Sequence, residues 1–264
     1  MSKKQLIFGD LHEKTYWCND VIKEESPDEV IQLGDIFDSF ITTKDSVAST
    51  CEWLQDFISK PNHIALLGNH EQFYRWTLVK QFVCSGNTME KMVQINDIIT
   101  IDDWNTLKLF YYDGKYLYSH AGISKEHFEH PVNGITIDGI TELCDKAIDN
   151  ANAGCAHPIL RAGMGRGGSE RVGGITWLCN MTESSAINGW NQLVGHTPYH
   201  SLNIHGRIKY TPNKKYPLGS IESLDFSGLY YTTITDGKLE YKSTGDTGYN
   251  VSNNHPQIRR IDKI

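Results

Sequence analysis

The chain has 264 residues and a formal charge of -7, with 39% hydrophobic and 22% charged residues. This composition is ordinary for a globular protein, and the acidic balance argues against a surface that binds duplex nucleic acid. No apolar run approaches the length that spans a bilayer, so we expect no membrane partner. Six cysteines are scattered without a C-x-x-C pair, which favours reduced thiols and a cytoplasmic location over a disulfide framework.

The first third of the chain alternates between short apolar strands and helical segments. Strands are predicted at 5–9 (QLIFG), 29–34 (EVIQLG) and 63–68 (HIALLG). A brief helix is predicted around Trp17 and Val21, and a longer one over 42–60, where Thr43 is a candidate N-cap. Strand–helix alternation with short connections predicts a parallel sheet.

The rest of the chain is less regular. Further strands are predicted within 115–122 (KYLYSHAG) and 191–198 (NQLVGHTP). The glycine-rich stretch 153–174 predicts a mobile loop that can fold over a substrate. Residues 229–243 (LYYTTITDGKLEYKS) predict a hairpin, because Asp236–Gly237 fits a tight turn. We expect one domain over 1–264, with the core motifs in 6–228, this hairpin, and a polar tail at 244–264.

The predicted strands share one feature, since each is followed at once by polar side chains. The endings read GDLH, GDIFD, GNHE, SHAG and GHTP in chain order. Ligands of open α/β sheets collect at the carboxyl ends of strands. The polar residues there are Asp10, His12, Asp35, Asp38, Asn69, His70, His120 and His196. Carboxylate, amide and imidazole groups together suit manganese, iron, zinc or similar cations.

These ordered motifs resemble those of the calcineurin-like metallophosphoesterase superfamily. GHTP and the late SLDFSG segment are most similar to the group of phosphoprotein phosphatases and bacterial or phage serine/threonine phosphatases. The resemblance spans residues 6–228. It implies an α/β (α+β) fold in which two facing mixed sheets are flanked by helices, an αββα sandwich with metals at one end.

The resemblance also implies two divalent ions, with manganese first and iron, zinc, nickel or magnesium as alternatives. The first ion would be bound by Asp10 and His12, Asp35 would bridge both ions, and the second would be completed by Asn69, His120 and His196. Two cations can hold the attacking and leaving oxygens of an in-line displacement and can make a water acidic enough to attack at neutral pH.

His70 is expected to stay off the metals, to reach the substrate phosphate beside Asn69, and to act as an acid backed by Asp38. Plainer interpretations stay open. Asp38 could cap the following helix, Glu71 could cap a helix or orient the loop, and Gly–Asp pairs are ordinary turn residues. His120 or His196 alone could be a buried structural histidine. The other histidines are expected to be surface or structural residues, and His157 is the one nearest the glycine-rich loop.

Four departures from the family pattern bear on the substrate. Glu13 stands where glycine is usual in the first motif, and Ser39 follows Asp38 where arginine is usual. Leu67 precedes GNHE where arginine is common, and Pro198 replaces a second histidine that many phosphodiesterases carry. The missing arginines normally hold phosphate oxygens by bidentate contacts.

Another arginine must therefore bind the phosphate. The candidates are Arg161, Arg166 and Arg171 of the glycine-rich loop, with Arg161 or Arg171 favoured. A solvated loop with incidental arginines is the alternative. The related WLCN segment at 177–180 ends in Cys179 and Asn180 rather than in an arginine.

The leading hypothesis is a metal-dependent phosphatase that hydrolyses phosphomonoesters, with phosphoserine or phosphothreonine of proteins as the first candidates. Its partner would be a phosphorylated substrate, either a phosphoprotein or a small phosphoester or nucleotide. The enzymatic rival hydrolyses nucleotides, dinucleoside polyphosphates or phosphodiesters. The rival of another class is a catalytically silent scaffold, which would have little reason to keep both His70 and Asp38. The oligomeric state stays open.

Overall fold

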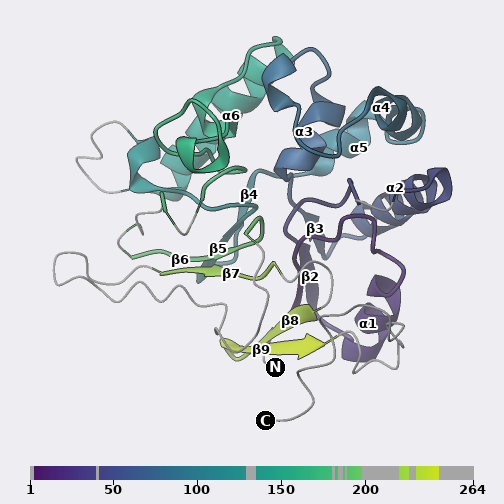
Figure 1. The fold of residues 1–264 in the computed structure, drawn as a ribbon. Helices are drawn as coiled ribbons and strands as arrows, with labels where there is room; N and C mark the ends of the chain where they lie inside the picture. Colours follow the sequence, from purple (N-terminus) through teal and green to yellow (C-terminus); the bar gives the residue numbers. More distant parts are fainter. Residues whose placement is uncertain are drawn as a thin grey trace.

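A computed structural model describes residues 3–39, 42–128, 135–179, 182–183, 187, 189–197, 220–225 and 230–243. These residues form two β-sheets with helices around them (Figure 1). The five-stranded sheet runs in the order β3 (His63–Ala65), β2 (Glu29–Gln32), β1 (Lys4–Phe8), β8 (Tyr230–Thr235) and β9 (Lys238–Ser243). The four-stranded sheet runs in the order β4 (Phe110–Tyr112), β5 (Tyr116–Ser119), β6 (Asn191–Val194) and β7 (Ser220–Ser223).

Both sheets are mixed, as the resemblance implies. Strands β1, β2 and β3 are parallel, whereas β8 runs antiparallel to β1 and pairs with β9. Strands β5, β6 and β7 are parallel, and β4 is antiparallel to β5. Asp236 and Gly237 have φ values of 54° and 73°, which confirms the tight hairpin turn. The predicted tail at 244–264 lies outside the described residues.

The helices include both that the first third predicts. They are α1 (Cys18–Glu25), α2 (Lys44–Ile58), α3 (Asn69–Arg75), α4 (Met89–Asn96), α5 (Ile101–Thr106) and α6 (Ile137–Asn152). Short 3₁₀ turns lie at Lys80–Phe82, Lys125–His127, Pro158–Leu160 and Met164–Arg166. Thr43 is the N-cap of α2, because its side chain accepts from the Ser46 N–H at 3.0 Å. In the described part of the chain, no helix has both the length and the apolar character needed to cross a bilayer.

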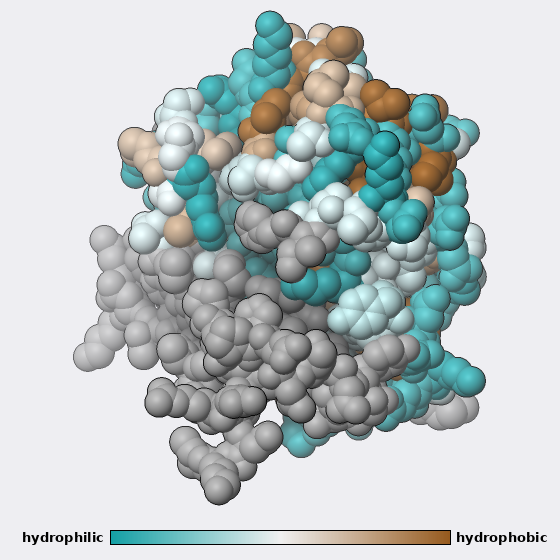
Figure 2. All heavy atoms as spheres, turned by 45° about the vertical axis from the view of Figure 1, so that its right-hand side comes forward, coloured by the Kyte–Doolittle hydropathy of each residue, from teal (hydrophilic) through white to brown (hydrophobic). Residues whose placement is uncertain are grey.

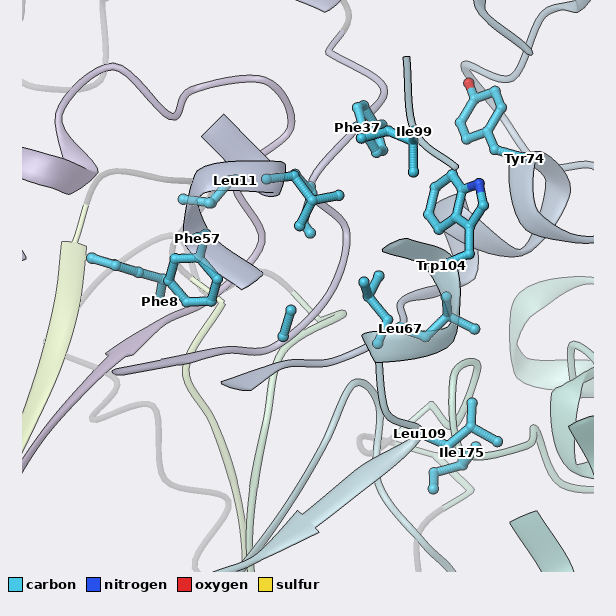
Figure 3. Close-up of a cluster of buried hydrophobic side chains, with 14 of the residues drawn as sticks. Phe8, Leu11, Phe37, Phe57, Leu67, Tyr74, Ile99, Trp104, Leu109 and Ile175 are labelled. Carbon is cyan, nitrogen blue, oxygen red and sulfur yellow. The ribbon is translucent and has the colours of Figure 1, made fainter. Parts of the chain in front are cut away.

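Alternation along β1 divides the core into layers. Leu6 and Phe8 point toward the helices and pack in one buried cluster with residues such as Trp17. Ile7 packs in another cluster, with Tyr118 of β5, Leu193 of β6 and Leu224, which follows β7. The two sheets therefore face each other through the cluster of Ile7. Figure 3 shows part of the helix-side cluster, in which Phe8, Phe57 and Trp104 come from different elements. Each such fully buried side chain contributes about 1.5–3 kcal/mol.

The parallel pairing brings the ends of several strands to one edge. Beyond the ladders, Leu33 donates its N–H to Phe8, Gly195 donates to His120 at 2.7 Å, and Leu224 donates to Val194 at 2.6 Å. The loops that follow β1, β2, β3, β5 and β6 are the ones that carry the predicted site residues. The fold thus places the five motifs beside one another.

Candidate metal centre and active site

Three of the predicted ligands converge around the imidazole of a fourth, His120, which is fully buried. His120 Nε2 lies 2.9 Å from Asn69 Oδ1, 3.2 Å from His196 Nδ1 and 3.3 Å from Asp35 Oδ2. His120 Nδ1 is 2.8 Å from the carbonyl oxygen of Leu33, which can only accept, so Nδ1 carries the proton of a neutral ring. Nε2 then offers a lone pair to a space bounded by an amide oxygen, a carboxylate and a second imidazole. A cation is what such a set of donors fits.

A second group of ligand atoms shares Asp35. His12, Asp35 and His70 each offer one atom within 4.8 Å of the others, as do Asp35, His120 and His196. His12 Nδ1 lies 2.9 Å from the carbonyl oxygen of Phe37, which can only accept a hydrogen bond. In a neutral ring Nδ1 therefore carries the proton, and Nε2 has a lone pair available for a cation. Membership of Asp35 in both groups matches the bridging position expected for it.

Asp10 lies beside the same cluster, at the end of β1. Its two carboxylate oxygens accept from the His196 N–H at 3.0 and 3.1 Å. A Cβ on Gly195 would meet Asp10 Oδ1 at 2.3 Å, so glycine is required for this approach. Burial, together with the carboxylates of Asp225 and Asp35, raises the pKa of Asp10 well above its ordinary value. A bound cation would relieve this accumulation of negative charge.

Asp225 is a site residue that the sequence reasoning missed. It follows β7, is 2% exposed, and its Cα lies 3.1 Å from where a Cβ on Gly9 would sit. Its signal was available, since SLD is a further polar strand end. Asp225 also lies near Lys14. Burial lowers the pKa of Lys14 below its ordinary value, and the Asp225 carboxylate offsets only part of this decrease.

His70 and Asp38 form the expected pair. His70 Nδ1 lies 2.9 Å from Asp38 Oδ2, and His70 Nε2 lies 3.8 Å from Asp35 Oδ2. Burial lowers the pKa of His70, but the carboxylates of Asp35 and Asp38 outweigh it and raise that pKa well above its usual value. Burial would raise the pKa of Asp38, but hydrogen bonds from His70 and Tyr74 lower it overall. Asp38 does not cap the following helix, because Thr43 does.

The Glu71 carboxylate links the loop after β2 to the loop after β3 by hydrogen bonds. Its Oε2 accepts from the N–H groups of Asp35 (2.8 Å) and Gly68 (2.9 Å), and its Oε1 accepts from those of Ile36 (2.8 Å) and Phe37 (3.2 Å). A Cβ on Gly68 would meet Asp35 Oδ1 at 2.2 Å, so the loops touch only because glycine stands there. Both expected roles of Glu71, capping α3 and orienting the loop, are confirmed.

Left-handed backbone conformations concentrate at these loops. The φ values are 45° at His12, 66° at Glu13, 54° at Asp35, 72° at Asp38 and 68° at His196. Such conformations cost about 1–3 kcal/mol each in non-glycine residues and cluster at functional sites. The positive φ of Glu13 also explains why glycine is the usual residue at that position of the family motif.

Two of the three candidate arginines are engaged elsewhere. Arg161 pairs with Glu170 at 2.7 Å, and Arg171, whose side chain is 83% exposed, pairs with Glu126 at 3.3 Å. The preference for Arg161 or Arg171 as the phosphate ligand is therefore not supported by their contacts. The loop that carries them is more extensively hydrogen-bonded than its aperiodic sequence suggests, since Glu183 accepts from the N–H groups of Gly165 and Gly173 at 2.5 and 2.9 Å.

Arg166 lies beside the metal ligands. Its Nη2 donates to Thr197 Oγ1 at 2.7 Å, directly after His196, and its positive charge helps to lower the pKa of His196, an effect in which burial is the largest cause. Within the described residues, the buried Nε of Arg166 has no hydrogen-bond partner. The ring of Trp177 packs edge-on against His196 at 5.6 Å between centroids.

The remaining described histidines have structural contacts, as expected. His63 packs on the ring of Phe57, His127 Nε2 lies 2.8 Å from the carbonyl oxygen of Gly173, and His157 caps a 3₁₀ turn. Four other histidines lie outside the described residues, namely His130, His200, His205 and His255. Asn180 and Pro198 also lie outside them.

A family model for calcineurin-like phosphoesterases matches residues 3–152. The chain belongs to the calcineurin-like phosphoesterase family. It is therefore a metal-dependent phosphoesterase of a family that works with two metal ions, and the two groups of candidate ligands that share Asp35 fit such ions. The two-sheet fold expected from the motifs is confirmed.

One solved structure supports the fold assignment of this phosphoesterase. A mutant of a cold-active protein tyrosine phosphatase aligns with a TM-score of 0.54 and 17% identity over 92% of this chain and 78% of that chain. A Saccharomyces cerevisiae protein serine/threonine phosphatase (TM-score 0.48, 13% identity, 91% and 80% covered) and a metallophosphoesterase from Sphaerobacter thermophilus (0.42, 12%, 92% and 88%) are more distant in structure. No curated protein matches the sequence.

Proposed function

We propose that this phosphoesterase hydrolyses phosphomonoesters, with phosphorylated side chains of proteins as the first substrate class. The observation that carries the proposal is the grouping of Asp35 with His12, His120 and His196, beside the His70–Asp38 pair, at one edge of the sheets. The first solved structure named above is that of a protein tyrosine phosphatase, which adds phosphotyrosine to the phosphoserine and phosphothreonine suggested by the motifs.

Asp10 and His12 would hold the first ion, Asn69, His120 and His196 would hold the second, and Asp35 would be shared by both. When bound, the ions supply an acidified water as nucleophile and offset charge on the phosphoryl oxygens. Manganese is the ion that we propose, because the donors mix carboxylate and amide oxygens with imidazole nitrogens. Reconstitution with manganese, iron, zinc, nickel or magnesium in turn would test that choice.

The chain's own contribution is to orient the phosphate and to supply a proton. Arg166 would bind nonbridging phosphate oxygens through its guanidinium group, whose buried Nε has no hydrogen-bond partner among the described residues and whose Nη2 donates to Thr197 Oγ1, and Asn69 would contact the phosphate as well. His70 donates a proton from Nε2 to the departing oxygen, while Asp38 holds Nδ1. We further propose that the chain acts as a single domain, since β8 and β9 complete the sheet that β1 begins, and that it works in the cytoplasm, where its cysteines stay free.

The test begins with metal content. Purified protein incubated with manganese is expected to hold about two ions per chain, and less than one would favour the silent scaffold. The values of kcat/KM are then compared for 4-nitrophenyl phosphate, phosphoserine, phosphothreonine and phosphotyrosine peptides, a dinucleoside polyphosphate and bis(4-nitrophenyl) phosphate. A phosphopeptide is expected to be the best substrate. Preference for the diester or the polyphosphate would overturn the proposal in favour of the nucleotide or phosphodiester alternative.

A further inference from the structure

Lys91 of α4 is a buried cation behind the proposed proton donor. It is 8% exposed, and its Nζ lies 3.0 Å from Asp38 Oδ1, whose side chain is completely buried. Nζ also donates to the carbonyl oxygen of Gly86 at 3.2 Å and lies 3.5 Å from Glu13 Oε1. Lysine is almost never fully buried unless it is paired, because its charge loses hydration. Its place against Asp38 therefore calls for a reason beyond packing.

Glu13 fixes the other side of this lysine. Glu13 Oε1 accepts from the Ser39 N–H at 3.1 Å and from Thr42 Oγ1 at 2.9 Å, and Oε2 accepts from Ser46 Oγ at 2.6 Å. The carboxylate is thus anchored to the segment between Asp38 and the start of α2. Glu13 occupies the family's usual glycine position, so this anchor is a feature of this chain.

Each oxygen of Asp38 has two donors. Oδ1 accepts from Lys91 Nζ and from the Tyr74 hydroxyl at 2.5 Å, whereas Oδ2 accepts from His70 Nδ1 and from Asn87 Nδ2 at 2.5 Å. Opposed donors on both oxygens prevent the carboxylate from rotating about its Cβ–Cγ bond. A Cβ on Gly86 would come within 3.0 Å of Asp38 Cβ, so the backbone closes the remaining side.

We propose that Lys91, held by Glu13, is a positioning residue that keeps Asp38 Oδ2 aimed at His70 Nδ1. The imidazole then presents Nε2 to the leaving oxygen of the substrate. In the step that this serves, the oxygen of the attacking hydroxide forms a bond to phosphorus as the P–O bond to the leaving group breaks. The electron pair of the broken bond goes to the leaving oxygen, and the proton on His70 Nε2 moves to that oxygen. Lys91 touches no reacting atom. The inference rests on the proposed function, because it requires His70 to be the acid.

The test uses leaving groups that differ in their need for a proton. In Lys91→Met, we expect kcat for a phosphoserine peptide to fall about 100-fold, as a misplacement near 1 Å can do. The loss should be much smaller with 4-nitrophenyl phosphate, whose phenolate departs without protonation. KM and metal content should stay unchanged, and Lys91→Arg should restore part of the lost rate. A lysine with a merely structural role would affect both substrates equally.

Lys44→Met is the matched control. Lys44, the first residue of α2, forms an ion pair at 3.2 Å with Glu90, the neighbour of Lys91 in α4, but its side chain is 79% exposed. This control variant should leave both rates unchanged. If Lys91→Met does not fold, Glu13→Gln decides, since it keeps Lys91 and removes the charge that holds it; a smaller loss with the same dependence on leaving group is expected. Equal losses with the two substrates, or no loss, would overturn the inference. A parent protein without manganese-dependent hydrolysis would instead overturn the proposed function.

Discussion

The two ends of β1 carry buried carboxylates in opposite electrostatic situations. Near the first residue of β1, the carboxylate of Glu25 (α1) forms ion pairs with Lys4 Nζ at 2.7 Å and Lys242 Nζ at 2.6 Å. It also accepts a hydrogen bond from the Tyr231 hydroxyl at 2.9 Å. Beyond the last residue of β1, Asp10 lies beside two further carboxylates that raise its pKa. At the first end the ion pairs are complete, whereas at the second end the proposed metal ions would offset the negative charge.

This contrast separates stability from function along one strand. At the Glu25 end the chain supplies its own cations, and these lower the pKa of Glu25 to about 2 despite burial, which acts to raise it. At the other end, left-handed backbone conformations and close contacts at glycines hold carboxylate groups near one another. Changes at the metal end should therefore abolish turnover, and changes at the Glu25 end should alter only the free energy of unfolding.

The largest effect is expected from Asp35→Ala, because Asp35 belongs to both ligand groups. Both ions should be lost, and turnover should fall by about 10⁴-fold or more, since metal catalysis supplies several kcal/mol of stabilisation to the transition state. Thermal unfolding gives an independent measurement. Manganese at 100 times its dissociation constant should stabilise the parent by about 2.7 kcal/mol, and this increment should vanish in the variant. Full metal content in Asp35→Ala would remove Asp35 from the proposed ligands.

His70→Ala should keep the ions but lose turnover. The expected loss is about 10²–10⁴-fold with a phosphoserine peptide, which is the usual contribution of a positioned acid. Metal analysis and steady-state kinetics on the same preparation measure both properties. Parent-like turnover of the phosphopeptide would contradict the role of His70 as the acid.

Arg166→Ala should raise KM and lower kcat/KM by about 10–100-fold, because a bidentate charged contact to phosphate would be lost. Metal content should be unaffected. Arg171→Ala is the matched control from the same loop, since Arg171 is 83% exposed and pairs with Glu126. A larger loss in Arg171→Ala than in Arg166→Ala would reverse the assignment.

The smallest effect is expected from Glu25→Gln, about 1–2 kcal/mol of unfolding free energy at pH 7 and none on metal content. The folded pKa of Glu25, about 2, lies below its ordinary 4.5. Ionised Glu25 therefore stabilises the fold above about pH 5, and its contribution is lost as the pH falls toward 2. Urea unfolding across this range should show a parent curve that approaches the variant curve at low pH. Parallel curves would contradict the ion-pair account.

Much of this arrangement was predictable from local signals in the sequence. The strands of the first third, the Thr43 cap and the Asp236–Gly237 turn depend on neighbouring residues, and the structure has all three. The polar strand ends were found because parallel pairing brings them to one edge. Asp225 obeys the same rule and was overlooked.

Other features depend on contacts between distant segments. Arg166, and not Arg161 or Arg171, donates to Thr197, and the neighbouring Gly165 N–H donates to Glu183, which lies far along the chain. The sequence shows Glu13 only as a departure from the family motif, and its contact with Lys91 depends on the folded structure. Figure 2 shows hydrophobic side chains gathered toward the top of one face among hydrophilic ones, and the exposed apolar residues Leu78, Met89 and Val93 were not foreseen either.

Glu71 has a consequence for how the centre behaves when the protein moves. One carboxylate grips main-chain N–H groups on both sides of the junction between the Asp35 loop and the helix that begins at Asn69. Asp35, the proposed shared ligand, and His70, the proposed proton donor, are thereby held by one carboxylate as a single rigid unit, which we call the bracket. Thermal breathing of the surrounding helices would shift this bracket as a whole, so that the spacing between attack and departure stays constant from one turnover to the next.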